Sequence, residues 1–381
     1  MKKVINLSGR IDSSNANVVE ENINKDLQNF NGELILDASN LEYISSAGLR
    51  IILKLKKSND MTEIINCSPE IYEIFNMTGF TEIMDISKSF REISIDGSEV
   101  IGDGFYGIVY RIDPETIVKV YKVPDSLEMI KREKKLARKA FVMGIPTAIP
   151  YDIVKVGNLY GSVFELLNAK SIASLINDDS YLDEFVKKSV GLLKTIHSTH
   201  VNPNELPSRR NQEIVLAQEC EKWLQPDVYK KLIVLLENIP ETYTMLHSDF
   251  HIKNIMQQDN ELLLIDMDTL STGHPIFEFG GMYATYYGFS CINKNNTQEF
   301  LGISFDTSKK IWDSTFKMYY NDKSKEELDK IQEKIAIISY LQILFLKTKF
   351  IEPDNEVQKK EIEFCQNYLN ENVPKLDTLS Y

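Results

Sequence analysis

The chain has 381 residues, more than one hydrophobic core usually accommodates, so its length predicts two or three domains. Hydrophobic residues at 43% and charged residues at 26% are ordinary for a folded globular protein and argue against general disorder. The net charge of -13 argues against a nucleic-acid-binding or anionic-membrane-binding surface. Such a charge keeps a protein soluble, and it also suits a cationic small molecule or a basic partner patch.

Neither an export signal nor a membrane span is expected. Two lysines follow Met1, but no apolar core comes after them, as a signal peptide requires. The longest apolar tract, from Ile335 to Phe350, is interrupted by polar residues and is too short to cross a bilayer, which favours a buried helix. Four cysteines occur without paired metal-ligand spacing: Cys67, Cys220, Cys291 and Cys365. We therefore expect a cytoplasmic protein without disulfides.

Residues 1–88 alternate between predicted strands and helices. Ser68 and Pro69 are a strong helix start, because serine caps a helix and proline suits its first position. The expected strands cover residues 4–12, 33–37 and 61–66, and the expected helices lie near 18–30, after 46 and after 69. This alternation predicts an α/β sandwich of under a hundred residues.

Three segments carry the most specific pattern of this region: LSGRID at 7–12, LD at 36–37 and YISSAGLR at 43–50. They resemble the STAS domain of the anti-sigma-factor antagonists. In that family a partner kinase phosphorylates a serine at the start of this helix, and the matching residue here is Ser46. A helix N-terminus stabilises a phosphate through its free N–H groups. The alternative is that Ser45 or Ser46 only caps the helix, and Ser45 stands where antagonists often carry Asp.

A second region begins after a polar junction at 87–89, with a strand expected from Phe90 to Ile95. A glycine-rich segment from Gly102 to Gly107 then precedes a strand that carries Lys119. Its spacing is that of a kinase glycine loop, since a dinucleotide-binding motif would open into a helix. Glycines let a hairpin backbone approach phosphates, and the lysine neutralises phosphate charge. The three glycines alone fit a plain hairpin as well, and Lys119 favours the nucleotide-binding interpretation.

The helix predicted from Leu127 to Met143 carries Glu133, which we expect to pair with Lys119 and hold its ammonium group at the phosphates. Glu128 is the alternative partner. Residues 161–167 follow a hairpin and correspond to a kinase hinge, whose backbone binds the adenine edge. The nucleotide-binding residues predicted in this way are Gly102, Gly104, Gly107, Val109, Lys119, Glu165 and Leu167.

Two polar segments, His247 to Asn254 and Asp266 to Asp268, follow short apolar runs that predict buried strands. Phosphoryl transfer needs a positioned hydroxyl and Mg²⁺ to neutralise phosphate charge. Asp249 is the predicted base that accepts or orients the hydroxyl proton. Asn254 and Asp266 are the predicted Mg²⁺ ligands, because Mg²⁺ prefers oxygen ligands. His247 is expected to hold the loop, and Asp268 to support the metal ligands.

The pattern HSDFHIKN at 247–254 and the DMD at 266–268 resemble the aminoglycoside phosphotransferase and choline kinase branch of the protein-kinase-like fold. The segment GHP at 273–275 also matches that branch, with Glu278 where Asp is commoner. The resemblance covers about residues 98–285. The glycine loop is closer to that of protein kinases, so the acceptor is a metabolite, an antibiotic or a protein hydroxyl.

The expected fold class is an α/β STAS-like sandwich joined to an α+β bilobal protein-kinase-like domain with a helical C-lobe. The STAS-like domain is expected over 1–88, the N-lobe and hinge over 89–167, and the C-lobe over 168–381. The expected function is transfer of the γ-phosphoryl group of ATP, with Mg²⁺, to a hydroxyl of a small molecule, with the STAS domain as a regulatory domain that can bind a protein partner. Two alternatives remain: a protein kinase that phosphorylates Ser46 in its own or a neighbouring chain, and a nucleotide-sensing scaffold.

Overall fold

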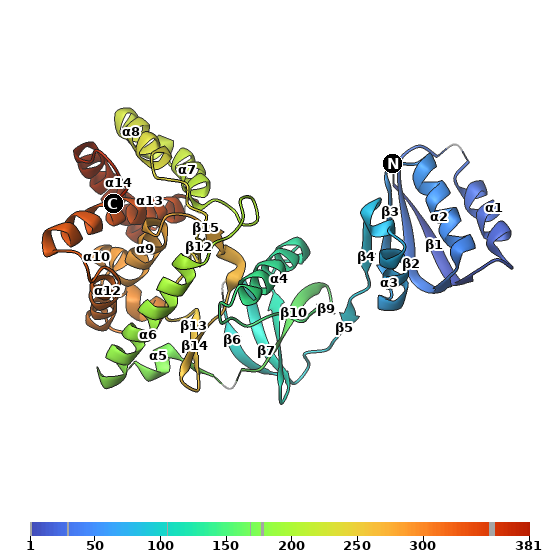
Figure 1. Cartoon of the computed structure of the whole chain (residues 1–381), viewed down its shortest axis with the longest axis horizontal. Helices are drawn as coiled ribbons and strands as arrows, with labels where there is room; N and C mark the ends of the chain where they lie inside the picture. Colours follow the sequence, from blue (N-terminus) through green and yellow to red (C-terminus); the bar gives the residue numbers. More distant parts are fainter. Residues whose placement is uncertain (1, 29, 105, 168, 177–178, 350–354) are drawn as a thin grey trace. The chain divides into compact units, whose positions relative to one another are not determined.

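The computed structural model describes residues 2–381 except 29, 105, 168, 177–178 and 350–354. The chain divides into two compact units, which are residues 1–96 with 153–160, and residues 97–152 with 161–381 (Figure 1). Each unit has its own hydrophobic core, one centred on residues such as Leu36 and Ile52 and the other on residues such as Leu264 and Ile338.

The first unit is built on a parallel sheet with strand order β1-β2-β3-β4. Parallel neighbours need crossover connections, and helices provide them here. The strands are β1 (Lys2–Ile11), β2 (Glu33–Ile44), β3 (Thr62–Cys67) and β4 (Ile86–Lys88), and the helices are α1 (Ala16–Asp26), α2 (Ser46–Ser58), α3 (Pro69–Met77) and the 3₁₀ turn η1 (Phe80–Glu82). The Ser68 hydroxyl accepts a hydrogen bond from the Ile71 N–H at the start of α3, which confirms the predicted cap.

Two local predictions for this unit were wrong. The second strand does not end at residue 37 but runs on to Ile44, pairing with β1 across two register shifts. Bulges let a strand continue where its alternation is broken, which is why polar residues such as Asn40 concealed the extension. The polar junction at 87–89 contains part of the edge strand β4. The strand expected over 90–95 is only β5 (Arg91–Glu92), which pairs with β9 (Asp152–Val156), and Ile93 adds a hydrogen bond from its N–H to the Lys155 carbonyl oxygen.

The second unit begins with antiparallel strands in the order β10-β8-β7-β6 and one long helix. Val118, Val120 and the helix residue Ile130 are among the buried side chains of this part. The elements are β6 (Glu99–Asp103), β7 (Gly107–Asp113), β8 (Thr116–Tyr121), α4 (Leu127–Val142) and β10 (Leu159–Glu165). The glycine segment therefore joins β6 to β7, and Lys119 lies on β8.

The remainder of this unit is mostly helical, with short strands around the segments 247–254 and 266–268 (Figure 1). The strands are β11 (Lys170–Ser171), β12 (Met245–Leu246), β13 (Ile255–Gln258), β14 (Glu261–Leu264) and β15 (Ser271–Thr272). The helices are α5 (Ile172–Leu175), α6 (Asp179–Ser198), α7 (Arg209–Glu219), α8 (Pro226–Glu237), α9 (Ile276–Tyr283), α10 (Phe289–Ile292), α11 (Asn296–Leu301), α12 (Phe305–Tyr319), α13 (Lys325–Lys349) and α14 (Glu356–Asn372). Shorter turns are η2 (Glu221–Trp223), η3 (Met267–Thr269), the π-helical η4 (Ala284–Gly288) and η5 (Val373–Lys375). The predicted fold class is confirmed.

Helix α13 contains the apolar tract predicted to be a buried helix. Residues from Ile335 to Leu344 are buried in the core of the second unit, while Phe350 lies outside the described residues. Within the described part of the chain, none of the helices combines the length and the apolar character needed to span a membrane.

Candidate active site

Lys119 lies between two acidic side chains that come from distant parts of the chain. Its Nζ is 3.2 Å from Glu133 Oε1 on α4 and 2.7 Å from Asp266 Oδ1, which follows β14. Glu128, the other candidate partner, instead pairs with Lys131 on the helix surface. The structure thus brings together the lysine, the helix acid and the first acid of the DMD segment.

The surroundings of Lys119 keep it charged. Burial opposes the charge, but Glu133 and Asp266 outweigh that effect and raise the pKa of the ammonium group. Glu133 is itself fixed, because its second oxygen accepts a hydrogen bond from the Tyr121 hydroxyl. Only 5% of the Glu133 side chain is exposed. Lys119 is therefore a permanent cation at a set position.

The glycines of the β6–β7 turn are not equivalent. A Cβ atom on Gly107 would lie 2.7 Å from the Val120 carbonyl oxygen, so the strand pairing itself requires glycine there. At Gly102 and Gly104 the nearest contacts would be 3.6 and 3.5 Å, which are ordinary distances. The fold itself therefore does not require glycine at these two positions, and the lack of a side chain there lets a ligand approach the backbone. Gly102 pairs with Val109 across the turn, and Phe105 lies outside the described residues.

Asp249 is held by its own loop. The Asn254 amide nitrogen donates to Asp249 Oδ2 at 2.7 Å, and His251 Nε2 lies 3.2 Å from Oδ1. Burial raises the pKa of a carboxyl group, but here the hydrogen bonds from His251 and Asn254 outweigh burial, and the pKa of Asp249 lies below its usual range. Asp249 is therefore an oriented carboxylate at neutral pH, as a proton acceptor must be.

The start of this loop is anchored by Glu278 of α9. Its two carboxylate oxygens accept hydrogen bonds from the backbone N–H groups of His247 and Ser248, at 2.7 and 2.9 Å. Glu278 is 1% exposed. The nearby His197, whose Nε2 lies 3.6 Å from Glu278 Oε2, and the hydrogen bond from the Ser248 N–H together outweigh burial and hold the pKa of Glu278 below its usual range. His247 Nε2 lies 3.3 Å from the Ile265 carbonyl oxygen, which ties the loop to the DMD segment.

Two residues with a strained backbone lie in the same segments. Ser248 and Asp266 have φ angles of 68° and 63°, in the left-handed region that residues other than glycine rarely adopt. Such conformations cost about 1–3 kcal/mol each and persist where the surrounding contacts impose them. These left-handed residues change the direction of the chain after β12 and β14, so Asp249 and Asp266 do not continue the two strands.

Asp268 has a different electrostatic environment from Asp266. Burial, reinforced by the negative charges of Asp266 and Glu133, raises the pKa of Asp268 to about 7. Asp268 is thus a carboxyl group near Asp266 and Glu133 that takes up a proton near neutral pH.

The residues predicted to form the hinge, Glu165 and Leu167, lie at the end of β10 and just after it. The Leu166 N–H donates to the Glu115 carbonyl at 2.7 Å. Because successive backbone groups of an extended strand point in opposite directions, the C=O of Glu165, the last residue of β10, faces away from Glu115.

Ser45 and Ser46 differ in role at the start of α2 in the first unit. The Ser45 hydroxyl accepts a hydrogen bond from the Ala47 N–H and is the N-cap. Ser46 is the first residue of the helix, and its side chain is exposed. The structure thereby separates the cap from the candidate phosphorylation site.

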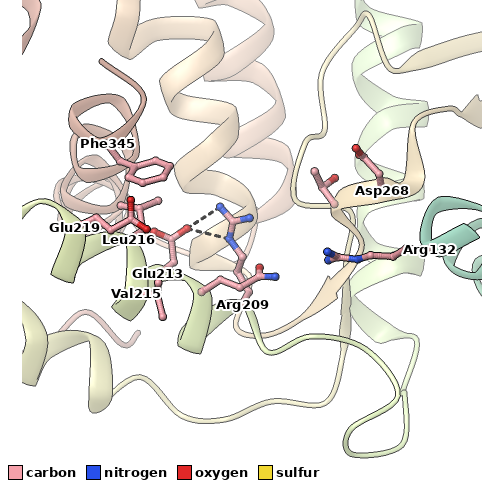
Figure 2. Close-up of a pocket in the computed structure, with 10 residues that line it drawn as sticks. Arg132, Arg209, Glu213, Val215, Leu216, Glu219, Asp268 and Phe345 are labelled. Carbon is pink, nitrogen blue, oxygen red and sulfur yellow. Dashed lines mark hydrogen bonds and ion pairs between the residues drawn. The ribbon is translucent and has the colours of Figure 1, made fainter. Parts of the chain in front are cut away.

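A cavity of about 300 Å³ opens beside the DMD segment (Figure 2). Figure 2 shows Arg132 and Asp268 on one side and residues of α7, with Phe345 of α13, on the other. Arg209 forms an ion pair with the buried Glu213 at 2.7 Å. The cavity walls therefore combine charged groups with apolar surface.

The donor set near Lys119 and Asp249 fits Mg²⁺ together with nucleotide phosphates. The Asn254 nitrogen is engaged by Asp249, which leaves its oxygen for a cation, and Asp266 contributes a carboxylate. Among the described residues no group of three or more His, Cys, Asp or Glu side chains forms a metal site. Mg²⁺ does not require one, because it usually keeps several waters and takes oxygens from phosphates.

Sequence reasoning missed three contacts of the site: the ion pair of Lys119 with Asp266, the contact of His251 with Asp249, and a hydrogen bond from the Ile252 N–H to the Tyr286 hydroxyl. The DxH spacing at 249–251 is a usable sequence signal for the second contact. No local pattern indicates the other two.

The strands, the helices and this site are those of a kinase-like phosphotransferase. The model of the family described as "Phosphotransferase enzyme family" matches residues 99–292, which are 194 of the 381 residues, and the chain belongs to this family. The STAS domain model matches residues 3–93. The protein is thus a phosphotransferase that acts on hydroxyl groups and carries a STAS domain.

Individual relatives resemble one or other part of the chain. A Bordetella bronchiseptica protein named as an anti-sigma factor antagonist, BtrV, is 32% identical over 87 residues, which are 22% of this chain and 75% of that protein. The ADP-bound aminoglycoside phosphotransferase APH(2'')-Ib is 16% identical with a TM-score of 0.49, covering 79% of this chain and 98% of its own. A choline/ethanolamine kinase family protein from Mesorhizobium loti is 11% identical with a TM-score of 0.48, covering 71% and 87%. These structural similarities carry no conclusion about the substrate.

Proposed function

We propose that the second unit transfers the γ-phosphoryl group of ATP, with Mg²⁺, to a hydroxyl group of a small molecule. The observation that carries this proposal is the position of Lys119, held between Glu133 and Asp266 by ion pairs of 3.2 and 2.7 Å. A buried cation fixed next to a candidate Mg²⁺ ligand is the arrangement that binding a triphosphate requires. We also propose that residues 89–167 are the N-lobe and hinge, and 168–381 the C-lobe.

The nucleotide is proposed to lie between the glycine turn and the hinge. Gly102 and Gly104 let the backbone approach the phosphates, and the Glu165 C=O and Leu167 N–H bind the adenine edge. Val109, which pairs with Lys119 across β7 and β8, contributes apolar surface on the neighbouring strand. Asp266 and Asn254 are the proposed Mg²⁺ ligands, and the ion, when bound, neutralises phosphate charge.

The transfer step follows from these positions. The acceptor oxygen attacks the γ-phosphorus, the bond from that phosphorus to the oxygen bridging to the β-phosphate breaks, and ADP leaves. Asp249 takes the proton of the hydroxyl, which its lowered pKa permits at neutral pH. Glu278 and Asn254 keep this carboxylate in place through the hydrogen bonds described above.

The acceptor is proposed to bind in the cavity beside Asp268. Its volume of about 300 Å³ is at the lower end of small-molecule sites. Arg132 and Glu219 offer charged groups, and Leu216 and Phe345 offer apolar surface. This combination suits a small molecule with several hydroxyl groups better than an extended apolar ligand.

One observation favours a second candidate function, phosphorylation of Ser46 in the same or a neighbouring chain. Ser46 is exposed, and Ser45 alone serves as the helix cap, so modification of Ser46 would not remove the cap. A phosphate at the first helical position would also be stabilised by the helix N-terminus.

A single experiment separates the two candidates. The full chain is incubated with Mg²⁺ and ATP in the presence of aminoglycosides, choline-like alcohols and sugars, while ADP release and the mass of the protein are followed. The proposed function predicts ADP release that depends on one acceptor class, with an unmodified protein. Phosphate found on Ser46 without turnover of any soluble acceptor would replace the first candidate by the second.

A further inference from the structure

A rare helical irregularity lies next to the proposed catalytic loop, which comprises residues 247–254. Residues Ala284–Gly288 form a π-helical turn, η4, between α9 and α10. Such a turn inserts one extra residue into a helix, weakens the local hydrogen bonding, and occurs frequently at functional sites. Here the neighbouring helices hold it in place, because the buried Ser308 of α12 donates a hydrogen bond to the Tyr286 carbonyl at 2.7 Å.

The side chain of Tyr286 reaches the centre of the catalytic loop. Its ring is 1% exposed, and its hydroxyl oxygen accepts a hydrogen bond of 2.9 Å from the Ile252 N–H. Ile252 is fully buried and lies between Asp249 and Asn254 in the sequence. Among the described residues, the Ile252 N–H has no second acceptor. Without the tyrosine oxygen this buried donor would lose its partner.

The π-turn explains how one helical run supplies two anchors for the same loop. An α-helix turns by roughly 100° per residue, so Tyr286, eight residues after Glu278, would point about 80° away from it. Absorbing one inserted residue leaves about seven helical steps, which return Tyr286 to within roughly 20° of the direction of Glu278. Glu278 then binds the start of the loop and Tyr286 binds its middle.

We propose that Tyr286 is a positioning residue for phosphoryl transfer: held on the π-turn, its hydroxyl fixes the backbone between the proton acceptor Asp249 and the metal ligand Asn254. This role rests on the proposed function of those two residues. Tyr286 touches neither the acceptor nor the nucleotide in this arrangement. Its loss is therefore expected to lower the turnover number and to leave nucleotide binding unchanged.

The test compares Tyr286→Phe with the wild-type full chain. The phenylalanine keeps the ring in the core and removes only the hydroxyl. We expect kcat to fall by about tenfold to a hundredfold, because small displacements of catalytic groups have effects of this size, while the KM for ATP stays unchanged. Tyr287→Phe is the matched control, because Tyr287 lies on the same turn but packs against Phe305 and Tyr283. Wild-type kcat in Tyr286→Phe, or an equal loss in Tyr287→Phe, would overturn the proposal.

Amide hydrogen exchange on the same proteins needs no catalysis. The Ile252 amide is expected to exchange at least tenfold faster in Tyr286→Phe, with the change confined to residues 247–254. Ser308→Ala removes the hydrogen bond to the Tyr286 carbonyl but leaves the Tyr286 hydroxyl in place, so it is expected to have a smaller effect in the same direction. If the wild-type protein transfers no phosphate to any acceptor, the proposed function fails, and this exchange alone decides whether Tyr286 holds the loop. Unchanged exchange at Ile252 would refute that role.

Discussion

His274 provides a prediction whose size follows from the structure. Its Nδ1 accepts a hydrogen bond from the Ile276 N–H at 3.1 Å at the start of α9, the helix that carries Glu278. A protonated imidazole has no acceptor nitrogen, so this contact requires the neutral form. Burial, and next the charges of His197 and Lys334, lower the pKa of His274 from 6.5 to about 4.

Protonation of His274 makes the free energy of unfolding depend on pH. Between pH 6.5 and about 4 the unfolded chain binds a proton at His274 that the folded protein does not bind, so stability falls as the pH falls through this window. At 1.36 kcal/mol per pKa unit, the loss amounts to about 2 kcal/mol at pH 5 and approaches about 3 kcal/mol near pH 4. Above pH 6.5 the contribution is fully present.

The variant His274→Asn isolates this effect, because asparagine retains a side-chain oxygen that can accept the Ile276 N–H and does not titrate. Both tryptophans, Trp223 and Trp312, lie in the second unit, so tryptophan fluorescence during urea unfolding reports on that unit alone. The free energy of unfolding should fall between pH 7 and pH 5 by about 2 kcal/mol more in the wild type than in the variant. Parallel pH curves for the two proteins would refute the reasoning.

Two further pairs of variants test the local assignments. Gly107→Ala should destabilise the second unit by about 1–3 kcal/mol, because its Cβ would meet the Val120 carbonyl at 2.7 Å, whereas Gly102→Ala should leave the melting temperature unchanged and weaken ATP binding measured by calorimetry. Equal stability of the two variants would contradict the distinction between them. Ser45→Ala should cost the STAS unit about 1 kcal/mol through loss of the cap, and Ser46→Ala close to nothing, as measured by urea unfolding followed by circular dichroism. The reverse order would show that Ser46 is the cap.

The parts of the site that the sequence predicted are those where chemistry depends on short spacing. Asp249 and Asn254 are five residues apart in one loop, and the structure joins them by a hydrogen bond of 2.7 Å. Glu133, the predicted partner of Lys119, belongs to the buried side of an amphipathic helix, whereas Glu128, the alternative that the sequence left open, lies on its exposed side. Local patterns of this kind need no knowledge of the tertiary fold.

Other contacts depend on tertiary structure that no local pattern encodes. Lys119 and Asp266 are 147 residues apart, and their ion pair exists only because β8 and the end of β14 come together in the folded unit. Tyr286 was concealed for a different reason, since helical periodicity assumes a constant turn per residue and the π-turn breaks it. Ser45 and Ser46 both suit a helix start, and only the extended backbone of Ser45, with ψ at 176°, decides between them.

The transfer of phosphate through Asp249 is the central claim, and its most direct test is the rate of γ-phosphoryl transfer from ATP by the full-length Asp249→Asn variant. Asp259→Asn is the matched control, because Asp259 is exposed and its φ of 51° suits asparagine equally well. We predict a fall in kcat of about two decades or more for Asp249→Asn, with ATP affinity retained and the control unchanged. Transfer by Asp249→Asn at the wild-type rate would contradict the account.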